Sequence, residues 1–163
     1  MTFLEICQWL ESSRLGEMVT LSQWGFPILV TTHLLGLGVS VGTIMWMDFR
    51  LLGWFLPSVP VPEVYRRVAP LALTGFAVMF LSGIVLFVGY ATSAYGNTFF
   101  RIKLAALLVA GVNAAAYHLF TERQVATWTG RRLPWPARAA GLVSIGVWTT
   151  VVLAGRMMSY TMF

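Results

Sequence analysis

Four long hydrophobic stretches, separated by short polar segments, dominate the pattern along this chain of 163 residues. Each stretch is close to the roughly 20 residues that a helix needs to cross a bilayer. A chain that crosses lipid must satisfy its backbone hydrogen bonds internally, and a helix does this. The pattern therefore predicts an all-α integral membrane four-helix bundle that forms a single membrane domain over residues 1–163. The expected spans cover about residues 24–47, 70–90, 99–120 and 137–158.

A short amphipathic helix is expected before the first span, over residues 2–13. Phe3, Ile6 and Leu10 recur at helical spacing on one face, whereas Glu5 and Gln8 lie elsewhere. About 12 residues are too few to cross a bilayer. We therefore expect this helix to lie in the membrane interface.

Basic residues follow the first and third spans, and they predict how the chain is oriented. The link between the second and third spans, residues 91–97, carries no charge. Cytoplasmic loops of membrane proteins are enriched in lysine and arginine. Both basic loops are therefore expected to be cytoplasmic, with both termini outside. The arginines concerned are Arg50, Arg66, Arg67, Arg123, Arg131, Arg132 and Arg138.

Composition supports the membrane assignment and argues against a nucleic acid as the binding partner. Only 10% of the residues are charged, against about 25% in soluble domains. The net charge of +5 comes from residues at the ends of hydrophobic stretches, so it indicates a bilayer rather than a nucleic acid as the partner. The single cysteine, Cys7, excludes an intrachain disulfide. No basic segment precedes the first apolar residues, so no cleaved signal peptide is expected.

The two histidines of the chain, His33 and His118, lie inside the first and third spans. An imidazole in hydrocarbon needs a partner, which can be a neighbouring helix or a metal. Haem iron binds imidazole, and an apolar helix bundle offers the walls that the macrocycle needs. The pair therefore predicts a haem, with His33 as the primary ligand.

The depths of His33 and His118 in the membrane distinguish two versions of this model. His33 lies roughly 5 Å outside the centre of its span, and His118 roughly 10 Å inside the centre of a span that runs in the same direction. The resulting offset of about 15 Å is large for two ligands of one iron. His118 is thus the second ligand of one haem, if tilt or stagger closes the gap, or it serves a second haem or another site.

Three cations, Arg101, Lys103 and Arg156, belong to the outer half of the spans. Such side chains often extend to lipid headgroups. Alternatively, they form a collar that holds haem propionates or a quinone headgroup. Lys103 is expected about 7 Å further out than His33, within reach of a haem held there.

Two methionines and one acid–base pair are further features of the sequence. Met157 and Met158 at the outer end of the fourth span offer thioethers, which bind Cu(I), but methionine also fills gaps in apolar bundles. Asp48 and Arg50 are expected to form a local ion pair at the membrane edge. No nucleotide loop, catalytic triad or zinc motif is visible.

Two segments resemble a group of small bacterial four-helix membrane proteins of unknown function. The first is His33-Leu-Leu-Gly-Leu-Gly followed by Asp48-Phe-Arg50-Leu-Leu-Gly53, and the second is Phe100-Arg-Ile-Lys103-Leu leading to Tyr117-His118. That group is similar to the bacterial four-helix protoporphyrinogen oxidase, to the copper-resistance D membrane domain and, more loosely, to b-type cytochromes.

The resemblance implies a haem b protein. In the oxidase, a histidine on the first helix and a lysine on the third form the functional pair, and His33 and Lys103 match them by position. Arg101 departs from the oxidase pattern, which often has histidine there. The resemblance also implies a bacterial inner membrane protein.

The leading hypothesis is therefore a haem b-binding membrane protein, with one or two haems, that moves electrons to or from a quinone or a redox partner protein. One alternative is a protoporphyrinogen oxidase-like enzyme. Others are a copper or small-solute permease and a structural membrane subunit that anchors partners or further copies of the chain.

Overall fold

A computed structural model describes residues 2–121 and 133–162 of the chain, and in this part it contains helices and no strand. The all-α prediction is confirmed. Residues 122–132, which include the predicted cytoplasmic residues Arg123, Arg131 and Arg132, lie outside the described part. The helices are α1 (Phe3–Glu11), α2 (Arg14–Leu21), α3 (Gly25–Leu52), α4 (Val61–Gly89), α5 (Ala91–Gly96), α6 (Thr98–Ala116), the π-helix η1 (Tyr117–Thr121) and α8 (Trp135–Met162).

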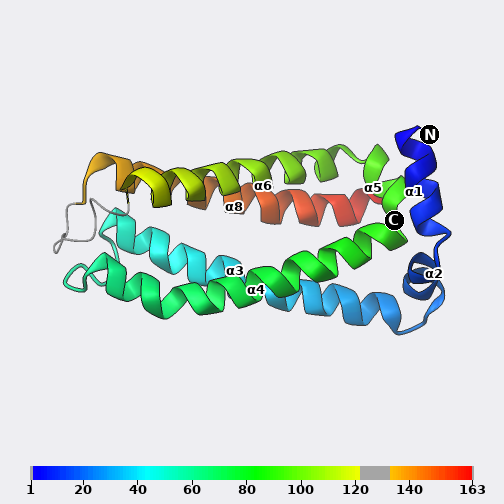
Figure 1. Cartoon of the computed structure of the whole chain (residues 1–163), viewed down its shortest axis with the longest axis horizontal. Helices are drawn as coiled ribbons and strands as arrows, with labels where there is room; N and C mark the ends of the chain where they lie inside the picture. The colour runs from blue at the N-terminus through cyan, green and yellow to red at the C-terminus, as the bar shows by residue number, and fades with distance from the viewer. Residues whose placement is uncertain (1, 122–132, 163) are drawn as a thin grey trace.

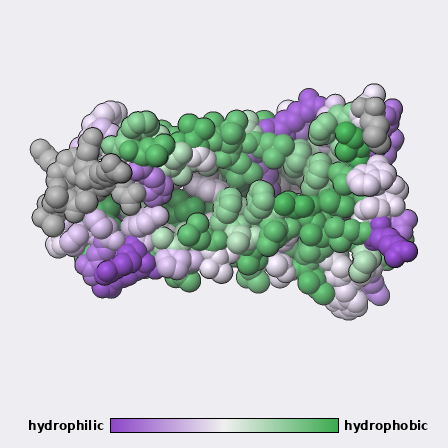
Figure 2. Space-filling model, viewed as in Figure 1, coloured by the Kyte–Doolittle hydropathy of each residue, from purple (hydrophilic) through white to green (hydrophobic). Residues whose placement is uncertain are grey.

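Four helical stretches are long and apolar enough to cross a membrane, as expected for a multi-pass membrane protein: α3, α4, α6 with η1, and α8. The second is longer than predicted, because it begins at Val61 instead of near residue 70. Pro62 lies in its first turn, where proline costs no hydrogen bond, and Pro70 is accommodated inside the helix. Hydrophobic residues cover most of the middle of the visible face, and hydrophilic residues gather toward its two ends (Figure 2).

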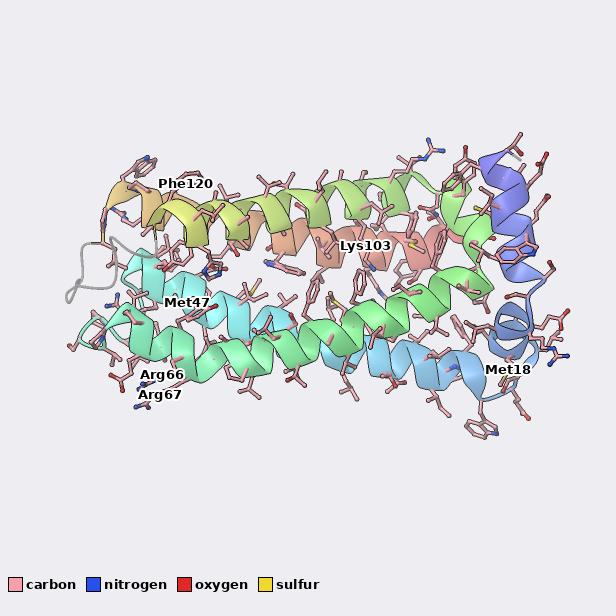
Figure 3. All side chains as sticks on the ribbon, in the orientation of Figure 1. Met18, Met47, Arg66, Arg67, Lys103 and Phe120 are labelled. Carbon is pink, nitrogen blue, oxygen red and sulfur yellow. The ribbon has the colours of Figure 1, made fainter. Side chains whose placement is uncertain are left out.

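The long helices form two pairs, α3 with α4 and α6 with α8 (Figure 1). Helix α3 also packs on α8, whereas the backbones of α4 and α6 have few close contacts. Both described ends of the chain lie at the same end of the bundle, where α1, α2 and α5 form a cap. Arg66 and Arg67 lie near the opposite end, on the outside (Figure 3). The predicted grouping of the termini away from these arginines is thus present.

The N-terminal cap differs from the single predicted helix over residues 2–13. Thr2 and Glu5 form a capping box that starts α1, and the Ser13 side chain caps a second helix, α2. The Glu11 carboxylate accepts hydrogen bonds from the backbone N–H and the hydroxyl of Thr92, both at 2.8 Å, and so holds α1 against α5. Trp9 remains exposed on the outer surface of this cap.

The backbones of α3 and α4 pack directly on each other at two glycines. A Cβ added to Gly36 would lie 2.7 Å from the amide nitrogen of Met79, and one added to Gly75 would lie 2.6 Å from that of Ser40. Neither position has room for a side chain, so small residues are required for this close approach, as is common between membrane helices. Ser40 is completely buried at this crossing.

Replacing Gly36 with valine is expected to force α3 and α4 apart and to destabilise the protein by about 2 kcal/mol. The thermal unfolding midpoint in detergent should fall by about 5 °C. Gly38→Val is the matched control, because a Cβ at Gly38 meets no atom within 4 Å. Equal midpoints for the two variants would contradict this account of the crossing.

Candidate functional site

The close crossing of α3 and α4 brings His33 against the backbone of α4. Its Nδ1 lies 2.8 Å from the carbonyl oxygen of Met79 and 3.2 Å from Oγ of Ser82. A carbonyl only accepts hydrogen bonds, and the hydroxyl proton of Ser82 is donated to the carbonyl of Val78 at 2.6 Å. Nδ1 must therefore carry the proton and donate it. In the neutral ring, Nε2 then keeps a lone pair that a metal can bind.

Gly83 makes room for this imidazole. A Cβ at this position would lie 3.1 Å from Cε1 and 3.4 Å from Nδ1 of His33, so even an alanine would press on the ring. The His33 side chain is half-buried between the two helices. Its position is thus set by Gly83 on one side and by the Met79 carbonyl at Nδ1.

Two apolar cavities meet at His33. The first, of about 370 Å³, extends between α3 and α8, past Leu34 and Gly155. The second, of about 460 Å³, extends between α4 and α6, past Ile84 and Leu104. Both volumes fall in the range of pockets that bind small ligands and cofactors. Six residues line both cavities: His33, Gly83, Phe87, Phe100, Lys103 and Val151.

Lys103 points from α6 into the space between the helix pairs (Figure 3). A Cβ on Gly155 would lie 3.8 Å from its Nζ, which places the ammonium group against α8. Among the described residues, none accepts a hydrogen bond from this ammonium or forms an ion pair with it. A cation in such apolar surroundings is costly without a partner, so the site favours a ligand with acceptor oxygens.

The other two predicted cations flank the same place. Arg101 lines the second cavity, and its guanidinium donates to the carbonyl of Tyr95 at 3.2 Å and lies over that ring. Arg156 lines the first cavity, and it donates to the hydroxyl of Tyr160 at 3.0 Å. The collar predicted from the sequence thus gathers around His33, with one arginine for each cavity.

His118 lies elsewhere. Its ring, in η1, makes edge contacts with Tyr65 and Tyr117, each with 5.4 Å between ring centroids. Tyr65 precedes Met79 on α4 by 14 residues, which corresponds to roughly 21 Å of helix. The two histidines therefore do not share a site. Of the two versions left open by the sequence, the one in which His118 serves another place is the one that fits.

Comparison with known proteins places the chain in a family. A model of a family of unknown function, DUF6644, matches residues 6–161. The chain belongs to this family. No curated protein and no solved structure matches it.

The expected ion pair between Asp48 and Arg50 is absent from this DUF6644 chain, although both side chains are buried. The Arg50 guanidinium turns to the loop after α3 and donates to the carbonyl oxygens of Val59 at 2.8 Å and Pro57 at 3.5 Å. Among the described residues, Oδ2 of Asp48 and Nη1 of Arg50 have no hydrogen-bond partner. Arg50 therefore fixes the loop instead of neutralising Asp48.

Sequence reasoning did not find the Met79 carbonyl, Ser82 or Gly83. Every residue has a backbone carbonyl, so the sequence does not show which one accepts a hydrogen bond from His33. Serine and glycine are frequent in membrane helices for packing alone. Within the described part of this DUF6644 chain, no group of three or more His, Cys, Asp or Glu side chains forms a metal site. Met158 lines the first cavity beside Arg156.

The tautomer of His33 is a direct test of this geometry. In His118→Gln protein labelled with ¹⁵N-histidine, the remaining imidazole should show the Nδ1–H tautomer, because Nδ1 donates to Met79. The measurement is the pair of ring ¹⁵N chemical shifts in ligand-free protein at neutral pH. A dominant Nε2–H tautomer would mean that the hydrogen bond to α4 is not formed.

Proposed function

We propose that this chain is a membrane protein that binds one haem b through His33 and transfers electrons. The observation that carries the proposal is the hydrogen bond from Nδ1 of His33 to the Met79 carbonyl. Histidines that bind metals almost always donate their other ring N–H to a carbonyl or a carboxylate, which fixes the tautomer and orients the ring. The free lone pair of His33 then belongs to Nε2, on a ring that lines both cavities.

The surrounding residues fit a haem. The walls are largely apolar and aromatic, and Phe87 stacks on Phe100 with 5.5 Å between ring centroids. Lys103 and Arg156 supply positive charge where the two carboxylates of a haem need partners. When bound, haem supplies a one-electron iron couple, and the protein sets its potential through the axial ligand and the polarity of the site.

The same proposal includes the membrane setting. The four long apolar helices would cross a bacterial inner membrane, with the arginine-rich end in the cytoplasm. The cap and both termini would then lie on the periplasmic side, with Trp9 and the apolar face of α1 in the interface. His33 and Lys103 would belong to the periplasmic half.

Haem binding by His33 is the first test. Protein purified with added haem is expected to show a Soret band, and His33→Gln should lose at least about 90% of it, since the ligand to iron is removed. His118→Gln is the matched control and should keep the band, because His118 lies outside the site. A band that survives His33→Gln but disappears in His118→Gln would overturn the assignment.

One observation favours a second candidate, a protoporphyrinogen oxidase-like enzyme. His33 and Lys103 line the same cavities, as the resemblance implies for the functional pair of that oxidase. A porphyrinogen is, like haem, a large apolar ring with carboxylates, so the same walls and cations would hold it.

Complementation separates this enzyme from an electron carrier. If the chain is such an oxidase, its gene should restore growth to a bacterial strain that lacks protoporphyrinogen oxidase. Lys103→Ala should then abolish rescue, because it removes the cation that lies in both cavities. His118→Gln should rescue as well as wild type. Absence of rescue by wild-type protein that is present in the membrane would rule out this second candidate.

A further inference from the structure

The second cavity is not needed for the iron. In its neutral form His33 has one free lone pair, so it would serve one metal. The two cavities extend from His33 in different directions, toward α8 and toward the seam between α4 and α6. Each also has its own arginine. Phe80, Ile84, Arg101 and Leu104 line only the second cavity, and this part of it is left for a second ligand.

The first cavity is the more enclosed. Helices α3 and α8 close it toward the arginine-rich end, where Gly141 packs on the backbone of Asp48. A Cβ on Gly141 would lie 3.2 Å from the carbonyl oxygen of Asp48. Arg156 and Met158 lie in this cavity as well. It therefore suits a resident cofactor.

The second cavity opens sideways. The backbones of α4 and α6 have few close contacts, although Phe87 stacks on Phe100 between them, and the cavity lies along this seam. Side chains at its rim are well exposed on the surface: 54% for Phe80, 45% for Ile84 and 49% for Leu104. This is a surface of apolar helices that would face lipid. A ligand reaches the cavity from the hydrocarbon phase, so it must be lipid-soluble.

The lining defines the head of that ligand. Its charged groups are Lys103 and Arg101, and no acidic side chain is among the described residues that form it. Both cations are hydrogen-bond donors without acceptor capacity. Phe80, Phe100 and Tyr95 provide aromatic faces around them. The matching ligand is a flat ring with carbonyl oxygens and an apolar tail.

We propose that the cavity between α4 and α6 binds a quinone that enters sideways from the bilayer and places a carbonyl oxygen at Lys103, whose three N–H donors can also serve a haem carboxylate. The inference rests on the proposed function for the membrane setting and for the haem in the first cavity. It adds a second ligand, and hence a redox partner class, at the same site.

The experiment uses full-length protein in lipid nanodiscs and an azido-quinone with a short isoprenoid tail as a photoreactive probe. Labelled peptides are expected from α4 and α6 near Ile84 and Leu104, and excess unlabelled quinone should suppress the labelling. Leu104→Trp fills the seam and is expected to lower labelling roughly tenfold, equivalent to about 1.4 kcal/mol of binding. Leu108→Trp, on the same helix and outside both cavities, should label like wild type.

A second pair of variants tests whether lost labelling is caused by misfolding. Ile84→Trp should block labelling as Leu104→Trp does, and Leu73→Trp, also exposed on α4, should not. All four variants are compared by thermal unfolding midpoint. Equal labelling of the blocking and control variants, or labelling that excess quinone does not suppress, would overturn the proposal. The latter result would indicate non-specific labelling by probe dissolved in the bilayer.

Failure of the two proposals can be told apart. The Soret band of each variant reports the haem site, and Leu104→Trp should retain it because Leu104 lines only the second cavity. If wild-type protein shows normal labelling but no Soret band, the proposed quinone site is supported and the proposed haem site is contradicted. If the protein shows a Soret band but no labelling that excess quinone suppresses, the haem site is supported and the quinone site is contradicted.

Discussion

The direct contact between the backbones of α3 and α4 determines the geometry of the site. Helices separated by ordinary side chains lie about 8–10 Å apart. At Gly36 and Gly75 no side chain intervenes, and the helices approach until the imidazole of His33 reaches a carbonyl of α4. That hydrogen bond fixes the proton on Nδ1 and leaves the lone pair on Nε2 free. Without the contact, His33 would be an ordinary intramembrane histidine with either tautomer open to it.

The two ends of the bundle are built differently, and this explains why the cavities lie at one of them. At the arginine-rich end, α3 packs on α8 at Gly141, and the buried Arg50 holds the loop after α3 through two carbonyl oxygens. Toward the other end α3 runs away from α8, and α1, α2 and α5 cap that end of the bundle (Figure 1). The bond between Glu11 and Thr92 keeps the cap in place. The result is a chamber with apolar walls and a cationic rim.

Sequence patterns predicted the all-helical class, the four apolar stretches and the placement of Arg101, Lys103 and Arg156 in the same half of the bundle as His33. These succeed because depth along a helix follows directly from residue count. The depth argument also indicated an offset of about 15 Å between His33 and His118 but left open whether they share one iron. Patterns did not predict the Met79 carbonyl or the fit of Gly83 against the ring, because both depend on which faces of α3 and α4 meet. The predicted ion pair between Asp48 and Arg50 is not formed, because the Arg50 guanidinium donates to backbone carbonyl oxygens of the following loop instead.

The central claim is that Nε2 of His33 is an iron ligand. It is tested most directly by an anomalous difference map, recorded at the iron absorption edge from crystals of the protein grown with haem. The account predicts one peak per chain, at bonding distance from Nε2 of His33 and between α3 and α8. A peak at His118, or haem bound with its iron away from His33, would contradict it.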